Sequence, residues 1–249
     1  MSTQDATRQL LFQMADDALI MGHRNSEWTG IGPTLEEDIA FSSMAQDKIG
    51  HAYQLYKILN AMGEGEMDKL AFNRNEKDFR SCHLVELPIG DYAFSLMRQF
   101  LFDTAESIRY EQLQNCSLTP LAQLAVKVKG ELRYHKMHAD VWIKQLANGT
   151  EESKARLQAA LSELWPYALG MFEEGDWQAA RKSEGLGDSE SEIREKWLAA
   201  VSPKLEEWNL RVESAEAVEG GRQGYHSEFL APLLKEMTEV FNIDPLASW

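Results

Sequence analysis

Apolar residues recur at helical spacing along most of the chain. The first such segment has an inward face made of Leu11, Met14, Ala18 and Met21. Because region 25–33 contains two glycines and a proline, we expect this helix to end there. A second helix is predicted from Thr34, a capping residue with Glu37 three positions on, to about Met62. Alternating patterns long enough for β-strands are missing from the sequence, so the pattern favours an all-α fold.

Two further helices are predicted after a polar crossover at 63–88. The third runs from about Asp91 to Gln114, and the fourth starts near Thr119 and ends before Asn148. The inward face of the fourth helix is expected to comprise Leu121, Leu124, Val128, Glu131, His135, His138 and Trp142. Residues 1–148 therefore predict a four-helix bundle.

The C-terminal part is expected to add three helices to this core. They span about 151–174, 191–212 and 223–241, and the segment before the last of them, Glu219 to Arg222, is expected to be a loop. Each helix contains one proline that should bend or restart it, namely Pro166, Pro203 and Pro232. We predict a single domain over 1–249, with the four-helix core in 1–148 and a helical elaboration in 149–249.

Acidic side chains occupy one position on each of the four core helices where an apolar residue is expected. They are Asp16 or Asp17, Asp47, Asp103 and Glu131. The first acid of each half precedes the second by similar distances, 30 or 31 residues and then 28, which suggests a duplicated helix pair. Di-iron bundles obtain a lone carboxylate and a Glu-x-x-His pair from each half. The chain thus has the outline of a carboxylate metal site.

The histidines of that outline are displaced by one position. Gly50 stands three residues after Asp47, and Tyr134 three after Glu131, whereas the next residues are His51 and His135. A spacing of four still places each histidine on the same helix face as its acid, so metal binding stays open here. However, aspartates replace glutamates at three positions, and their shorter stems would not close a bridge between two metals.

The alternative is a former metal core that now holds hydrogen bonds and ion pairs. Buried acids then need cationic partners, and the candidates near them in sequence are Arg24, Lys48, Arg98, Arg109, Lys127, Lys129 and Arg133. The rival hypothesis is a self-sufficient oxidase that binds iron or manganese through Asp16, Asp47, His51, Asp103, Glu131 and His135. Iron storage or small-molecule binding without redox chemistry is a third alternative.

Charge and composition exclude several other functions. Forty acids against 25 bases give a formal charge of −15, which repels nucleic-acid phosphates and anionic membrane surfaces. The sequence has no apolar run of about 20 residues and no basic leader, so we expect a cytoplasmic protein. Cys82 and Cys116 form no CxxC motif and are expected to be reduced thiols. No serine or cysteine pattern indicates nucleophilic catalysis.

A series of short motifs extends along the whole chain. In order, these are His23 to Gly30, Gly32-Pro33, Leu35 to Ala40, Leu70 to Phe72, Leu84 to Glu86, Arg133 to His135, Asn148 to Thr150, and Gly220-Gly221 with Gly224, His226, Glu228, Leu230, Pro232 and Glu236-Met237. The series resembles the PaaC family, the non-catalytic partner subunits of bacterial phenylacetyl-CoA ring-1,2-epoxidases. His51 departs from the family pattern, in which an uncharged amide is common, and adds a candidate ligand beside Asp47.

This resemblance implies a ferritin-like bundle that has lost its metal site. It implies no catalytic residue, cofactor or metal in this chain, with degenerate site positions at Asp16, Asp47, His51, Asp103, Glu131, Tyr134 and His135. The iron and the epoxidation would belong to a homologous catalytic subunit, PaaA, fed with electrons by a separate reductase. The isolated chain is expected to be either a monomer or a homodimer, without nucleic-acid or membrane partners.

Binding such a partner requires an exposed apolar face. Tryptophans are the candidate contacts, namely Trp28, Trp165, Trp177, Trp197 and Trp208, although a tryptophan is more often part of the core or of half-buried surface. Arg24, Glu27 and Trp28 follow the first helix closely. They are expected to form either a partner contact or a loop anchored by an ion pair.

Overall fold

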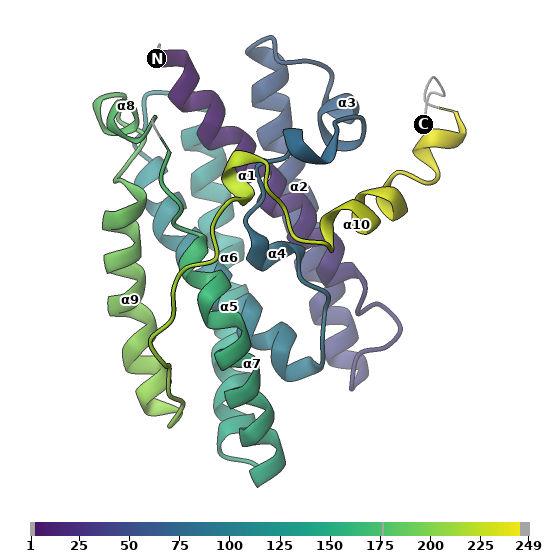
Figure 1. Ribbon diagram of the computed structural model, residues 1–249, viewed down its shortest axis with the longest axis vertical. Coiled ribbons are helices and arrows are strands. Elements are labelled where there is room, and N and C mark those ends of the chain that lie inside the picture. The colour runs from purple at the N-terminus through teal and green to yellow at the C-terminus, as the bar shows by residue number, and fades with distance from the viewer. Residues whose placement is uncertain (1–2, 176, 245–249) are drawn as a thin grey trace.

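Four long helices lie side by side in the computed structural model, which describes residues 3–175 and 177–244 (Figure 1). They are α1 (Thr3–Ser26), α2 (Leu35–Ala61), α5 (Tyr92–Leu113) and α6 (Thr119–Ala147). Helix α1 packs along α2, and α5 along α6, while α2 also contacts α6. The described residues contain no β-strand, so the prediction of an all-α, ferritin-like bundle is confirmed. The predicted duplication of a helix pair stays a prediction.

The ends of these helices follow from local capping. The Thr34 side chain accepts a hydrogen bond from the backbone N–H of Glu37, at 3.4 Å, and the Asp91 side chain accepts one from that of Phe94, at 2.9 Å. Pro120 occupies the first turn of α6, where its missing N–H breaks no helical bond. The predicted capping box at Thr34 is incomplete, because the Glu37 carboxylate points inward to Tyr92 and His138 instead.

The crossover between α2 and α5 differs from the polar connection that was predicted. It contains α3 (Met67–Phe72), the short 3-10 turn η1 (Glu76–Asp78) and α4 (His83–Glu86). All four residues of α4 are buried, and α4 contacts both α1 and α7 (Glu151–Gly170). This part of the crossover is therefore core, and the prediction of a polar connection is wrong for it.

The C-terminal part contains α7, α8 (Gln178–Ser183), α9 (Glu190–Glu207) and α10 (Leu230–Met237), with 3-10 turns η2 (Gly221–Gln223) and η3 (Phe241–Ile243). Helix α8 was not predicted, and α10 starts at Leu230 rather than near position 223. Between α9 and α10 the chain crosses in front of the long helices as an extended yellow-green trace (Figure 1). Two glutamate side chains hold the backbone of this segment. Glu173 accepts a hydrogen bond from the N–H of Gly220, at 2.7 Å, and Glu86 accepts one from the N–H of Ser227, at 2.9 Å.

The prolines interrupt the C-terminal helices less than expected. Helix α7 continues through Pro166, and α9 continues through Pro203. The carbonyl of Pro166 accepts a hydrogen bond from the backbone N–H of Val218, at 3.0 Å, which ties the extended segment to α7. Pro232 lies in the first turn of α10, where a proline is tolerated. The alternative that these prolines restart their helices is wrong, and the alternative that they bend them stays a prediction.

The tryptophans proposed for a docking surface are buried. This applies to Trp28, Trp165, Trp177, Trp197 and Trp208. Trp197 donates its indole N–H to the carbonyl of Leu101, at 2.9 Å, and stacks on Trp165 with ring centroids 5.2 Å apart. Because all five tryptophans pack in the interior, a docking role is excluded for them in the folded chain.

Arg24, in the last turn of α1, and the residues that follow this helix form a loop anchored by an ion pair, the second of the two predicted alternatives. Arg24 forms an ion pair with Glu27, at 2.7 Å, and its guanidinium also donates to the carbonyl of Glu86. The Trp28 indole donates to the Ser95 hydroxyl, at 2.9 Å. The loop is thus anchored internally. Separately, none of the described helices has the length and apolarity needed to cross a bilayer.

Candidate functional site

A buried ion pair lies at the centre of the four long helices. Asp103 on α5 has no exposed surface, and the ammonium group of Lys48 on α2 forms an ion pair with it. Gln99 donates a second hydrogen bond to the Asp103 carboxylate. Burial alone would raise the pKa of Asp103, but Lys48 and His135 hold it below its usual range. The ammonium group of Lys48 thus neutralises the central carboxylate.

The two displaced histidines bind acids on the opposite helix. His51 of α2 is hydrogen-bonded through Nε2 to Glu131 of α6, at 2.7 Å. His135 of α6 is hydrogen-bonded through Nε2 to Asp47 of α2, at 2.9 Å. The structure therefore brings together all four residues, as the spacing of four predicted, but each histidine pairs across the helices and not with the acid on its own helix.

These four residues range from the interior to the rim of the bundle. The side chains of Asp47 and Glu131 are 30% and 24% exposed, whereas those of His51 and His135 are buried. The hydrogen bond from His135 lowers the pKa of Asp47, and that from His51 lowers the pKa of Glu131. These shifts favour the ionised form of both rim acids, which accept hydrogen bonds from the imidazoles beneath them.

The two histidines differ in their electrostatic surroundings. His135 lies between two acids, because its Nδ1 is 3.4 Å from a carboxylate oxygen of Asp103 while its Nε2 binds Asp47. Burial lowers the pKa of His135, but these two acids outweigh burial and raise it overall. For His51, burial outweighs the hydrogen bond to Glu131, so its pKa is lowered.

The acids of α1 bind segments outside this centre. Asp16 accepts hydrogen bonds from the Tyr56 hydroxyl, at 2.6 Å, from the Arg74 guanidinium, at 3.0 Å, and from the backbone N–H of Arg80, at 2.7 Å. Asp17 accepts from the backbone N–H of Cys82, at 2.8 Å, and from Arg222, at 2.7 Å. Both carboxylates thus hold the crossover and the C-terminal segment against α1.

This donor set does not fit a di-iron centre. Such a centre needs carboxylate oxygens from α1 and imidazole nitrogens that are free to bind metal. Here Arg74 holds Asp16, acids occupy the Nε2 atoms of both histidines, and Lys48 places a positive charge against Asp103. Tyr134, which stands where a ligand histidine would, is 42% exposed. Within 3–175 and 177–244, no three His, Cys, Asp or Glu side chains are grouped to hold a metal.

Only part of the predicted set of cationic partners binds these acids. Lys48 binds Asp103, and Lys127 lies 3.4 Å from Glu131. The others have different roles, as Arg24 and Arg98 donate to backbone carbonyls, Lys129 pairs with Glu111, Arg109 pairs with Glu106 and Glu190, and Arg133 is exposed. Lys48 inside the bundle and Lys127 at its rim thus supply the lysine charges for these acids, while His51 and His135 supply hydrogen bonds.

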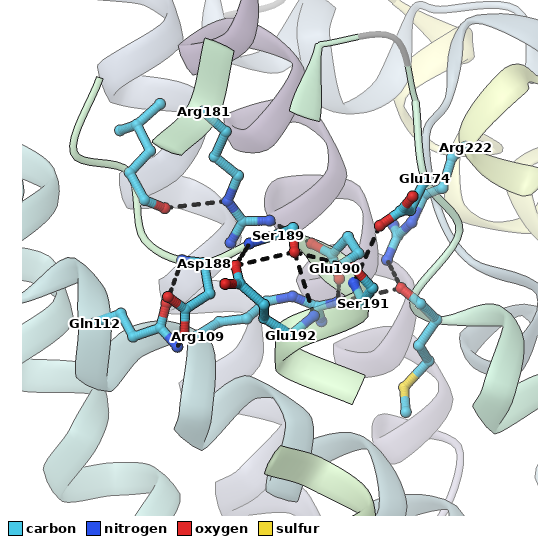
Figure 2. Close-up of polar contacts among 12 residues, drawn as sticks. Arg109, Gln112, Glu174, Arg181, Asp188, Ser189, Glu190, Ser191, Glu192 and Arg222 are labelled. Atoms are coloured by element: carbon cyan, nitrogen blue, oxygen red, sulfur yellow. Dashed lines mark hydrogen bonds and ion pairs between the residues drawn. The ribbon is translucent and has the colours of Figure 1, made fainter. Parts of the chain in front are cut away.

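A second buried group of charges was not predicted from the sequence. Figure 2 shows Glu190, at the start of α9, between the guanidinium groups of Arg109 and Arg181. Arg109 also pairs with Glu106, at 3.1 Å, and we call these four residues the C-terminal cluster. All four are buried. Spacing along one helix signals only the Glu106–Arg109 pair, since the other partners come from separate helices.

Two further buried pairs were also missed. His138 of α6 is hydrogen-bonded to Glu37, at 2.7 Å, and the Tyr92 hydroxyl donates to the same carboxylate. His226 of the C-terminal segment is hydrogen-bonded to Glu86 of α4, at 2.7 Å. The place of His138 on the predicted inward face of its helix was the only sequence signal for either pair.

Fold and site together define a class, a ferritin-like all-α bundle with carboxylates and histidines at its centre and a lysine among them. Residues 1–249 match the family described as phenylacetic acid catabolic protein, and the chain belongs to this family. The predicted resemblance is thereby confirmed.

Two curated relatives come from Escherichia coli K12, and both belong to 1,2-phenylacetyl-CoA epoxidase. The chain is 31% identical over 239 residues to the C subunit of that enzyme, a match that covers 95% of this chain and 96% of the relative. It is 24% identical over 250 residues to the A subunit, covering 96% of this chain and 79% of the relative.

Proposed function

We propose that this chain is the accessory subunit of a 1,2-phenylacetyl-CoA epoxidase complex in phenylacetate catabolism, where it stabilises a homologous catalytic subunit. The observation that carries the proposal is the similarity to the epoxidase C subunit over 95% of the chain. The lower identity to the epoxidase A subunit, 24%, supports a partner of common ancestry rather than the same role.

The centre of the bundle supports an accessory role. Lys48 pairs with Asp103, and His51 and His135 hydrogen-bond the rim acids, so side chains of the fold itself already occupy these carboxylates. We propose that this chain holds neither metal nor cofactor, and that the iron and the reacting atoms belong to the catalytic subunit. The remaining partners of the complex would include a reductase that supplies electrons. The donor set gives no support to the rival hypothesis of a self-sufficient oxidase.

Co-expression with the homologous catalytic subunit from the same organism tests this proposal. The measurements are the yield of soluble catalytic subunit, co-elution of the two chains in size-exclusion chromatography, and oxygen-dependent turnover of phenylacetyl-CoA with the reductase present. We expect the two chains to co-elute and turnover to require both. A catalytic subunit that is equally soluble and active without this chain would contradict the proposal, as would turnover by this chain alone.

A further inference from the structure

The outer face of the α2–α6 pair carries exposed apolar residues at helical spacing. Of the 13 large hydrophobic residues exposed in the described chain, eight lie on these two helices, so exposed apolar surface is concentrated there. We call them the α2–α6 face, which comprises Leu35, Ile39, Ile49 and Tyr53 on α2 and Val126, Tyr134, Met137 and Val141 on α6. Their exposed fractions range from 41% for Ile49 to 69% for Leu35.

Charged side chains gather on the other exposed side of α6. Lys129 pairs with Glu111 of α5, and Lys144 pairs with Glu207 of α9. On α2, the exposed residues between Asp38 and Lys57 are uncharged apart from the partly exposed Asp47, which binds His135. A surface with so few charges is unusual in a chain of which 26% is charged.

Two glycines lie within this face, Gly50 on α2 and Gly130 on α6. A Cβ atom added at either position would meet no atom within 4 Å, so the chain's own packing does not require glycine there. By contrast, a Cβ at Gly170 would collide with the carbonyl of Val218. Because glycine is less favourable than alanine inside a helix, the two open positions need another explanation. Close approach of a second chain's backbone supplies one.

Two surface hollows lie along the same helices and could receive side chains of a second chain. One, of about 640 Å³, is lined by Ile58, Met62 and Leu124 among others, with Lys57 and Lys127 at its edge. The next, of about 650 Å³, is lined by Ile49, Gly50 and Tyr53 and shares Lys127 with the first. The face is therefore grooved as well as apolar, which suits a packed helix.

We propose that the α2–α6 face binds the homologous catalytic subunit through that subunit's own equivalent helix pair, an inference that rests on the proposed function. The relative that is 24% identical aligns with 96% of this chain, so a partner of that kind has the same two helices to offer. Two such antiparallel pairs pack face to face about a pseudo-two-fold axis.

Charge disfavours a second copy of the chain as the occupant of this face. A second copy satisfies the same geometry, but each copy carries a formal charge of −15, and two such chains repel each other.

A charge placed in the middle of the face tests the proposal. Met137→Glu should weaken binding of the purified catalytic subunit on the order of 100-fold in biolayer interferometry, because a buried unpaired carboxylate opposes association. Val240→Glu is the matched control, since Val240 is 59% exposed, like Met137 at 57%, but lies outside the face. The control should bind like the wild type.

A second variant separates docking from folding. Gly130→Leu adds a good helix former in open space, so the isolated chain should melt at the same temperature as the wild type or higher. Its added bulk should nevertheless weaken binding of the catalytic subunit at least tenfold, because the two backbones can no longer approach. A variant that merely damaged the fold would lower the melting temperature as well.

The outcomes distinguish the two proposals. A wild-type chain that does not bind the catalytic subunit at all would overturn the proposed function. Wild-type binding that Met137→Glu and Gly130→Leu leave unchanged would overturn the α2–α6 face alone. Self-association of the wild-type chain that both variants abolish, with binding of the catalytic subunit unchanged, would assign the face to a second copy.

Discussion

The centre of the bundle and the C-terminal cluster both bury charges, but they differ in enclosure and in the origin of the partners. In the centre, Lys48 pairs with Asp103, two histidines hydrogen-bond Asp47 and Glu131, and these two acids still reach solvent. In the C-terminal cluster, Glu190 links arginines of α5 and α8 without solvent contact. The comparison indicates that the cluster couples the C-terminal helices to the core, whereas the centre joins the long helices to one another and stays partly open to solvent.

Removing the acid of the C-terminal cluster should have the largest effect. Glu190→Gln leaves Arg181 buried without a carboxylate and Arg109 with Glu106 only. We expect the free energy of unfolding to fall by about 3–5 kcal/mol, the usual consequence of breaking a buried ion pair. Urea unfolding at pH 7 measures this change.

The matched control for that variant is Glu152→Gln, which removes an exposed partner of Arg156. Exposed pairs contribute little, so this change should leave the unfolding midpoint nearly unchanged. Equal effects of the two substitutions would show that the C-terminal cluster does not couple the helices.

Removing the central lysine should have the next largest effect. Lys48→Met leaves Asp103 fully buried with an imidazole and an amide as its remaining partners, and should cost about 2–4 kcal/mol in urea unfolding. The double variant Lys48→Met/Asp103→Asn removes both charges and should be more stable than the single variant. A double variant as unstable as the single one would contradict the role of Lys48 in charge balance.

The two central histidines should give pH effects of opposite sign and smaller size. The pKa of His135 is raised in the folded chain, so its stabilisation is complete below the unfolded value of about 6.5 and is lost as pH rises through the folded value. The stability difference between wild type and His135→Gln should therefore shrink between pH 6 and pH 9.

For His51, whose folded pKa is lowered, the unfolded chain takes up the proton first. The stability of the wild type relative to His51→Gln should therefore increase as pH rises from 5 to 7. Urea unfolding at several pH values measures both differences. The same sign for both histidines would contradict the environments described for them.

The core of the fold was predictable from the sequence, because apolar spacing and the cap at Thr34 are local signals. The site was predictable only in part. Spacing placed His51 and His135 beside acids, but the pairing across α2 and α6 depends on the register of the two helices, which spacing does not determine.

Long-range partners explain the remaining errors. The Arg109–Glu190 pair joins residues 81 positions apart, and no local pattern marks such a partner. Helix α4 looked polar because the acid that it buries, Glu86, is paired with His226, 140 residues away. The start of α10 shifted because Glu86 and Glu173 hold the backbone that precedes it in an extended form.

Iron content measures the central claim most directly, namely that this chain supports a complex without holding a metal itself. The chain should be expressed in iron-supplemented medium, purified alone, and compared with the purified complex. We expect no stoichiometric iron in the isolated chain, and equal iron in complexes made with wild type and with His51→Gln/His135→Gln. Close to two iron ions per isolated chain, lost in that double variant, would contradict the account.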